Sequence, residues 1–337
     1  MKREGYLFER IVTFQNLLLA SRKAMRGKKL KKSVGSFYFD LENEVIEIKR
    51  DLENRTYRPG PYTQFEIFEP KRRKICSSVF RDRVVHHAVC NFVEPLFEDR
   101  AIHDSYACRE KKGSHAAIKR CQEYTRRFQY YLKCDIRKFF ESVDHGILKS
   151  QLRRIIKDDK LLTLLDLIID HSVPGAPLGK GIPIGNLTSQ HFANFYLGEL
   201  DHFIKDKLRI KGYVRYMDDF ISFSNSKEEL HGLLYEIGLF LERELKLKLK
   251  DKVTRLSPVS EGAPFLGFRI YPQLIRIKRE NLVRLRRKIK RKEKLYLKGK
   301  ITEEMLVQSV GSMTAHVSHG DSLSERRHIF NTSLKLA

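Results

Sequence analysis

The chain has 337 residues, with 66 Lys and Arg against 42 Asp and Glu, so its formal net charge is +24 with neutral histidines. Hydrophobic residues make up 41% of the chain, which is enough to bury a core and argues against disorder as the main state. The excess of positive charge argues against a small cationic substrate and favours a polyanionic partner, usually nucleic acid.

The first third of the chain has the pattern of helices followed by a strand pair. Apolar residues at helical spacing predict one helix over the first 30 residues and another over 40–54. Alternating residues predict a strand over 63–68, and 75–80 is expected to return beside it. A further helix is expected over 82–97, ending near Pro95.

The middle of the chain is richer in strands. The expected elements are strands over 128–136, 213–216, 220–223 and 265–270, and helices over 144–156, 160–170, 188–208 and 227–245. The β–α–β–β–α order across 128–250 is that of a split βαβ sheet with helices on one face.

The composition shifts near Pro272, where we place a domain boundary. Residues 269–300 contain fourteen Lys or Arg and two acids. An apolar stripe at helical spacing runs through this segment, formed by Leu282, Leu285, Ile289 and Tyr296. The pattern predicts a helix that docks by one face and is strongly positive on the others.

The sequence has none of the marks of a membrane or secreted protein. The longest apolar candidate, 161–169, is shorter than the roughly 18 residues of a membrane span and contains Asp166. Glu9 and Arg10 interrupt the apolar stretch that a signal peptide needs. Five widely spaced cysteines without a CxxC pair suit a reducing compartment. We therefore expect a cytoplasmic protein.

Three acidic residues stand out in this basic chain. Asp218 and Asp219 lie between two apolar strands, and Asp135 ends another apolar strand. Carboxylates in such places are costly unless a positive group neutralises them. Two Mg²⁺ ions would do so, because Mg²⁺ prefers carboxylate oxygens together with substrate phosphates. The alternative is that the Asp pair is an ordinary Asp-rich β-turn.

Several motifs resemble those of reverse transcriptases, and the resemblance covers nearly the whole chain. The run Tyr216-Met217-Asp218-Asp219 is similar to the polymerase hairpin of that family, and the run from Asp135 to Phe140 is similar to its preceding acidic motif. Residues 105–109 with Lys112-Gly113 resemble a fingers motif. Residues 265–268 resemble the primer grip.

The resemblance implies an α+β right-hand polymerase. Its palm would be a ferredoxin-like split βαβ antiparallel sheet, and its thumb would be helical. We expect fingers with an N-terminal helical extension over 1–127, a palm over 128–272 with an insertion at about 150–187, and a thumb over 273–337.

The resemblance also assigns the metal site. Asp135 and Asp218 are expected to bind two Mg²⁺ ions directly, and Mn²⁺ can substitute. Asp219 is expected to be a third ligand or a partner of one. The backbone carbonyl of Ile136 is expected to complete one of the sites.

Residues for the incoming deoxynucleotide follow from the same resemblance. Phe140 matches the aromatic gate that would collide with a ribose 2′-OH, with plain core packing as the alternative. Lys71 and Arg73 lie in a basic turn that would hold the triphosphate, with a solvated turn as the alternative. Lys252 resembles the lysine that protonates the leaving phosphate, but several lysines crowd residues 246–252.

Template RNA and the RNA–cDNA hybrid are the expected macromolecular partners. Phe265, Leu266 and Gly267 form the expected primer grip. The predicted basic helix supplies cationic contacts to the hybrid, for which we select Arg284, Arg287, Lys288 and Arg291.

One loop points to a subfamily. Most reverse transcriptases have Gln-Gly-x-x-x-Ser-Pro where this chain has Ile184 in the place of the Gln and Gln190 in the place of the Pro. This pattern resembles the enzymes of diversity-generating retroelements, which copy a template-repeat RNA with misincorporation opposite adenines (mutagenic retrohoming). Their resemblance implies a basic accessory variability protein as partner. We expect Ile184, with Arg73, to affect fidelity and, like Gln190, to line the nucleotide site.

A physical route connects Ile184 to low fidelity. A Gln beside the nascent base pair can hydrogen-bond the nucleotide and penalise a displaced one, whereas Ile makes no such bond. Loop packing without a fidelity effect is the alternative for Ile184.

Two further functions stay open at this stage. One is a phage-defence or retron-type reverse transcriptase, and the other is a catalytically inert RNA-binding or maturase-like protein.

Overall fold

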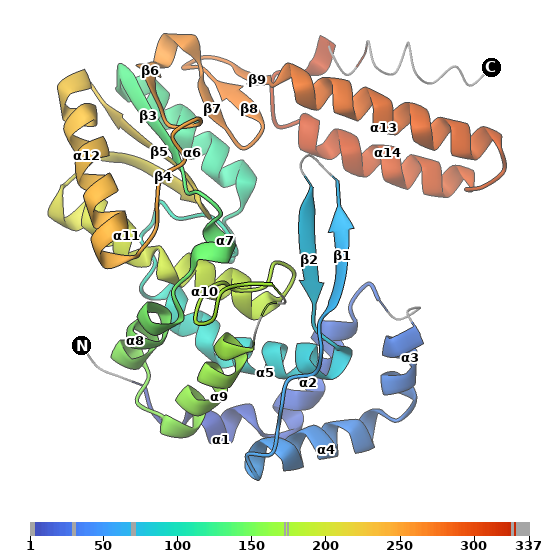
Figure 1. Cartoon of the computed structure of the whole chain (residues 1–337). Helices are drawn as coiled ribbons and strands as arrows, with labels where there is room; N and C mark the ends of the chain where they lie inside the picture. Colours follow the sequence, from blue (N-terminus) through green and yellow to red (C-terminus); the bar gives the residue numbers. More distant parts are fainter. Residues whose placement is uncertain are drawn as a thin grey trace. The chain divides into compact units, whose positions relative to one another are not determined.

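The structure is a computed structural model (Figure 1) and describes residues 4–28, 32–68, 72–171, 173, 175–324 and 327. The chain forms two compact units that alternate along the sequence. The first unit comprises Met1–His103, Ile136–Phe203 and Ile237–Leu249. The second unit comprises Asp104–Asp135, Ile204–Glu236 and Lys250–Ala337. The fingers, palm and thumb boundaries remain a prediction.

The N-terminal segment of the first unit is two helices, α1 (Leu7–Ile11) and α2 (Phe14–Met25), so the single helix predicted over the first 30 residues is wrong. The break lies at Thr13, whose hydroxyl oxygen accepts the backbone N–H of Asn16 at 3.3 Å and caps α2. Leu19, one of the apolar residues at helical spacing in this segment, is exposed.

The first unit continues with helices and one hairpin. The elements are α3 (Lys32–Phe39), α4 (Leu41–Glu53), β1 (Thr63–Ile67), β2 (Arg73–Ser77) and α5 (Phe80–Glu98). Helix α4 and the antiparallel hairpin β1–β2 confirm the predictions for 40–54 and 63–68, although the returning strand begins at Arg73 rather than at residue 75. Helix α5 confirms the helix predicted over 82–97, although it continues through Pro95 to Glu98 instead of ending near that proline.

The rest of the first unit is helical. It contains α7 (Phe139–Ser142), α8 (His145–Ile155), α9 (Asp159–Asp170), α10 (Leu187–Tyr196) and α11 (Gly198–His202). Asp144 and Asp158 cap α8 and α9, each accepting a backbone N–H at 3.1 Å. The single helix predicted over 188–208 is wrong, because the segment divides into α10, α11 and a π-helical stretch, η1 (Phe203–Lys207).

An antiparallel sheet of four strands forms the centre of the second unit. The strands β3 (Tyr130–Asp135), β4 (Gly212–Tyr216), β5 (Asp219–Ser224) and β6 (Arg255–Pro258) lie in the order β4-β5-β3-β6. This is the predicted split βαβ arrangement, in which β3 pairs with β5 and β6. Helix α12 (Lys227–Glu244) follows β5 and has residues in both units.

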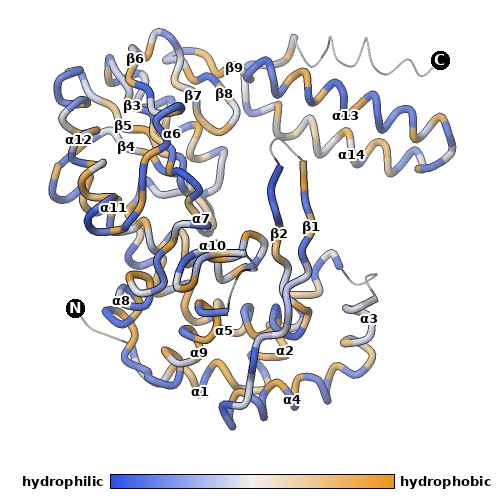
Figure 2. Tube along the Cα trace, in the orientation of Figure 1, coloured by the Kyte–Doolittle hydropathy of each residue, from blue (hydrophilic) through white to orange (hydrophobic). Residues whose placement is uncertain are grey.

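A helix that we did not predict covers one face of this sheet. Helix α6 (Ser114–Arg127) packs against β4 and β5. Its buried residues Ile118 and Cys121 join Tyr131, Ile221 and Phe223 of the sheet in one core cluster. Figure 2 shows the hydrophobic residues of β5 in the sheet.

The C-terminal part of the second unit has a small sheet and two helices. The predicted strand over 265–270 is wrong, because it divides into β7 (Ala263–Phe265) and β8 (Phe268–Ile270), which are joined to β9 (Ile275–Ile277) and preceded by the 3-10 turn η2 (Val259–Glu261). The basic helix is confirmed as α13 (Arg279–Leu297), whose Leu285 and Ile289 are buried against α14 (Glu303–Val317). Within the described residues, no helix has the length and apolarity to cross a membrane.

Candidate active site

The three predicted carboxylates lie at one edge of the four-stranded sheet. Asp135 is the last residue of β3 and pairs in register with Asp219, the first residue of β5. Tyr216 pairs with Asp219, so Met217 and Asp218 form a two-residue turn between β4 and β5. All three carboxylates are half-buried. The fold therefore brings together residues that are more than 80 positions apart in the sequence.

A buried lysine shares this face of the sheet. Because strand residues alternate between faces, Lys133 lies on the same face of β3 as Asp135. Lys133 is 5% exposed and its ammonium group pairs with the carboxylate of Asp219. Burial lowers the pKa of Lys133 to about 7, and the negative charge of Asp135 opposes this shift. The ammonium group also lies 5.3 Å from the ring centre of Phe265.

A second lysine approaches the same edge from the segment before β6. The Nζ atom of Lys250 lies 3.8 Å from Oδ1 of Asp135, and its backbone N–H donates to the carbonyl of Asp135 at 2.9 Å. Lys252, our predicted proton donor, is exposed in the following turn. Of the other nearby lysines, Lys246 pairs with Asp144 and Lys248 with Glu242.

The chemistry of this edge fits divalent cations in part. Asp135 and Asp219 present hard oxygen donors from directly opposed positions, and Asp218 follows on the turn. Across the part of the chain that the structure describes, no group of three His, Cys, Asp or Glu side chains is gathered closely enough to hold a metal ion. One or two carboxylates suffice for Mg²⁺ when substrate phosphates complete the shell.

The predicted primer grip forms a tight turn between β7 and β8. Phe265 pairs with Phe268, and the two turn residues Leu266 and Gly267 have φ of 45° and 89°. Positive φ at both central positions is typical of a type I′ hairpin turn. The Gly267 carbonyl accepts the side-chain amide of Asn281 at 2.9 Å, which joins the turn to α13.

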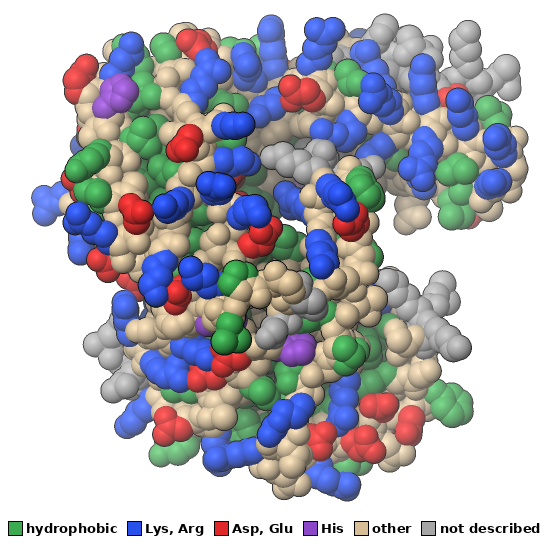
Figure 3. Space-filling view, in the orientation of Figure 1, with side chains coloured by type: hydrophobic (Ala, Val, Ile, Leu, Met, Phe, Trp, Pro, Cys, Tyr) green, Lys and Arg blue, Asp and Glu red, His purple; other side chains and the backbone are tan. Residues whose placement is uncertain are grey.

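A groove of about 250 Å³ brings the primer grip together with part of the basic helix. Gly267 and Phe268 line it beside Arg284 and Lys288 of α13. Arg284 also donates to the side chain of Asn281 at 3.1 Å. The other two predicted cationic residues, Arg287 and Arg291, are exposed. Figure 3 shows Lys and Arg side chains gathered along α13.

Four residues predicted for the nucleotide site, Arg73, Phe140, Ile184 and Gln190, lie in the first unit. The backbone N–H of Ile182 donates to the carbonyl of Phe140 at 2.8 Å, and the N–H of Cys76 in β2 donates to the carbonyl of Ile184 at 2.9 Å. Phe140 and Ile184 are both half-buried. One loop therefore connects the predicted aromatic gate to the strand that begins at Arg73.

The remaining predicted residues of this unit are placed as follows. Ile136 is buried and bridges to Leu249 through the backbone. Arg73 is exposed at the start of β2, and Gln190 is exposed on α10. Lys71 lies outside the described residues.

Sequence reasoning missed the buried cations around the carboxylates. Lys133 and Arg215 lie inside apolar strands, and each is 5% exposed or less. A charged residue within such a run was the available signal, because burial of a cation requires a partner. The position of Lys250 depends on the pairing of its segment with Asp135 and has no comparable local signal.

Comparison with known proteins agrees with this geometry. The family model for reverse transcriptase (RNA-dependent DNA polymerase) matches residues 69–270. The group II intron-encoded protein LtrA of Lactococcus lactis is 23% identical over 320 aligned positions, covering 74% of this chain and 53% of LtrA. The protein YkfC of Escherichia coli is 26% identical over 276 positions, covering 68% of this chain and 72% of YkfC.

A solved structure supports the right-hand polymerase fold. The apo telomerase of Candida tropicalis superposes with a TM-score of 0.51 at 12% identity, over 66% of this chain and 49% of the telomerase chain. This chain spans about half the length of LtrA, 53%. The match to the family model extends from β2 through the carboxylate edge to β8. The chain therefore belongs to the reverse transcriptase family.

Proposed function

We propose that this chain extends a DNA primer on an RNA template, with Asp135, Asp218 and Asp219 at the reaction centre. The observation that carries the proposal is the in-register opposition of Asp135 and Asp219 beside the turn that presents Asp218. Membership of the reverse transcriptase family supports the same reaction.

Different residues have different roles at this reaction centre. Mg²⁺, when bound, would lower the pKa of the primer 3′-hydroxyl and neutralise the triphosphate. Asp135 and Asp218 would hold it, and Lys133 orients the carboxylate of Asp219 through their ion pair. Lys250 takes the proton-donor role predicted for Lys252, because its ammonium group lies 3.8 Å from Asp135.

Recognition of the incoming deoxynucleotide is assigned to the residues that the sequence predicts for it. The ring of Phe140 excludes a ribose 2′-OH, and the cationic Arg73 and Lys71 bind the triphosphate. The Phe140→Ala variant should incorporate ribonucleotides at a higher ratio to deoxynucleotides than wild type. An unchanged ratio would mean that Phe140 is only a packing residue.

The central test is primer extension by the full chain on a defined RNA. Wild type should extend the primer, and Asp218→Ala should lose activity by at least about 10³-fold because a metal ligand is removed. Asp251→Asn changes an exposed carboxylate of the second unit and serves as the matched control. Equal extension by wild type and Asp218→Ala would reject the proposal, and an inactive wild type would favour an inert RNA-binding protein.

We further propose error-prone copying of a template-repeat RNA, as in diversity-generating retroelements. The apolar Ile184 supports this proposal, because the loop that carries it contacts β2 and offers no side-chain hydrogen bond at that position. A basic accessory variability protein would be the partner that helps to engage the RNA.

Sequencing of cDNA made with and without that partner tests the proposed subclass. Errors concentrated at template adenines support it, and uniform high fidelity rejects it in favour of a retron-type or phage-defence enzyme. Ile184→Gln should lower the adenine error rate, whereas an unchanged rate would leave Ile184 as loop packing.

A further inference from the structure

The turn that carries Asp218 is held in a strained conformation. Met217, its first residue, has a φ of 55°, in the left-handed region that glycine favours. A side chain there costs free energy and persists only where the surroundings determine the backbone. The turn therefore needs contacts that hold Met217 in place.

A buried arginine supplies one such contact. Arg215 is 1% exposed, and its Nη1 atom donates to the carbonyl oxygen of Met217 at 3.1 Å. Arg215 pairs in register with Phe220, one residue along from the pair of Tyr216 and Asp219. Its side chain therefore starts from the face of the sheet opposite to Asp219 and braces the turn from that side.

The backbone of Arg215 is clamped as well. Its N–H donates to the carbonyl of Asp104 at 2.9 Å, and its carbonyl accepts the N–H of Tyr106 at 3.0 Å. Ser105, between them, forms a parallel bridge with Arg215 and is fully buried. The segment 104–106 thus extends the outer edge of β4 where the strand enters the turn.

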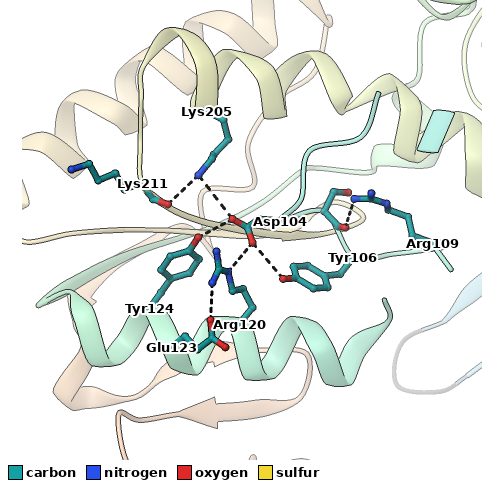
Figure 4. Close-up of polar contacts among 9 residues, drawn as sticks. Asp104, Tyr106, Arg109, Arg120, Glu123, Tyr124, Lys205 and Lys211 are labelled. Carbon is teal, nitrogen blue, oxygen red and sulfur yellow. Dashed lines mark hydrogen bonds and ion pairs between the residues drawn. The ribbon is translucent and has the colours of Figure 1, made fainter. Parts of the chain in front are cut away.

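This segment is anchored by the carboxylate of Asp104, which is 4% exposed (Figure 4). The hydroxyl of Tyr124 and the Nε atom of Arg120, both on α6, donate to it at 2.8 Å. The Nζ atom of Lys205 lies 3.9 Å from it and donates to the carbonyl of Lys211 at 3.0 Å. Because Lys211 precedes β4, the Asp104 cluster is connected to both ends of that strand.

We propose that Arg215 is a positioning residue for the carboxylate turn and that Asp104 is its anchor. Together they fix Met217 and Asp218 so that Asp218 keeps the position, beside Asp219, from which it and Asp135 would hold metal ions. Both residues are buried, so we assign them a positioning role and not a catalytic one. The inference rests on the proposed function, since it assigns the turn a catalytic role.

The Met217→Gly variant distinguishes a positioning role of Arg215 from a general contribution of Arg215 to the stability of the fold. Met217→Gly makes a positive φ nearly cost-free, so the turn depends less on Arg215. Arg215→Met should therefore weaken metal binding much less in the Met217→Gly background than in the wild-type background. If Arg215 only supported the fold, its substitution would weaken metal binding equally in both backgrounds.

The measurement is Mn²⁺ binding by electron paramagnetic resonance, made on the full chain with a bound RNA–DNA hybrid, together with the Mg²⁺ concentration for half-maximal extension. Arg215→Met should weaken Mn²⁺ binding roughly tenfold and raise the Mg²⁺ midpoint by a similar factor, and by less than about threefold in the Met217→Gly background. Asp104→Asn should shift both in the same direction, by about threefold, and gives the same test if Arg215→Met does not fold.

Arg255→Met is the matched control, because it removes an arginine from β6 that pairs with Glu261. It should leave both metal readouts unchanged. Unchanged Mn²⁺ binding in Asp104→Asn and in folded Arg215→Met overturns the inference, as does an equal cost of Arg215→Met in both backgrounds. If Asp218→Ala extends primers as fast as wild type, the proposed function has failed instead.

Discussion

The carboxylate edge of the sheet and helix α13 carry charge in opposite ways. At the edge, Asp135 and Asp219 are half-buried and each has a lysine partner, Lys250 or Lys133. On α13, Arg287 and Arg291 are exposed. Lys and Arg side chains gather on the surface along this helix (Figure 3). The first arrangement fixes a few charges in position, and the second gathers many charges on one surface.

The two arrangements are suited to different tasks, one to specificity and the other to affinity. Charges shielded from water interact strongly, but each must be paired, because an uncompensated one is costly. Exposed charges are screened within about 8 Å at physiological salt and contribute little singly. The sheet edge is therefore expected to define the reaction, and α13 to supply affinity for a polyanion.

Thiol labelling gives the largest expected contrast between the two regions. Burial raises the pKa of Cys134, next to Asp135 in β3, to about 12. At pH 8 its thiolate fraction should be roughly a thousandfold lower than that of an ordinary cysteine. A cysteine introduced by Lys290→Cys, at an exposed position of α13, is the comparison. Peptide mapping after timed alkylation measures both rates, and equal rates would show that the sheet interior is open to water.

The next largest effect is expected for the rate of primer extension when the buried Lys133 is removed. Lys133→Met removes the partner of Asp219, so the carboxylate loses its orientation and extension should slow by about 100-fold. Steady-state primer extension with a melting curve measures the loss in folded protein.

Lys227→Met is the matched control for Lys133. The Nζ atom of Lys227 also lies over an aromatic ring, 5.2 Å from the centre of Tyr130, but its side chain is exposed. Its loss should change the rate by less than about twofold, because exposed contacts contribute little. A similar rate for Lys133→Met and Lys227→Met would remove the distinction between buried and exposed charge.

The same contrast explains what the sequence could predict. Asp218 and Asp219 stand between apolar strands, and the stripe through Leu285 and Ile289 follows the helical period, so both regions have local signals. The partners of the carboxylates are different. A charge within an apolar run marks Lys133 as a buried cation, but Lys133 and Lys250 acquire their partners only when β3 pairs with β5 and with the segment before β6. Strand pairing is long-range, and no local pattern specifies it.

Local misjudgements have local causes. The helix expected over the first residues is interrupted because Thr13 offers its hydroxyl as a cap. The strand expected over 265–270 contains Leu266 and Gly267, whose positive φ values form a hairpin turn. Helix α6 was missed although its buried residues Ile118 and Cys121 lie at helical spacing.

Removing several charges from α13 should weaken binding without abolishing the reaction. The variant with all four of Arg284, Arg287, Lys288 and Arg291 changed to Gln loses up to four phosphate contacts. The slope of log affinity against log salt should then become shallower by about 3 to 4, with roughly tenfold or more weaker binding at physiological salt. Hybrid binding over a salt series measures this change, and an unchanged slope would place the hybrid elsewhere.

The smallest effect belongs to a single exposed cation. Arg287→Gln should reduce the salt slope by no more than about 0.9 and weaken hybrid binding a fewfold, because each phosphate neutralised releases about one counterion. Arg284→Gln should weaken hybrid binding more, since Arg284 lines the groove beside Gly267 and also donates a hydrogen bond to Asn281. Salt titrations of hybrid binding by the two variants, made in parallel, measure this difference. If Arg287→Gln alone reproduced the loss of the fourfold variant, α13 would hold a specific contact and its charges would resemble those of the sheet edge.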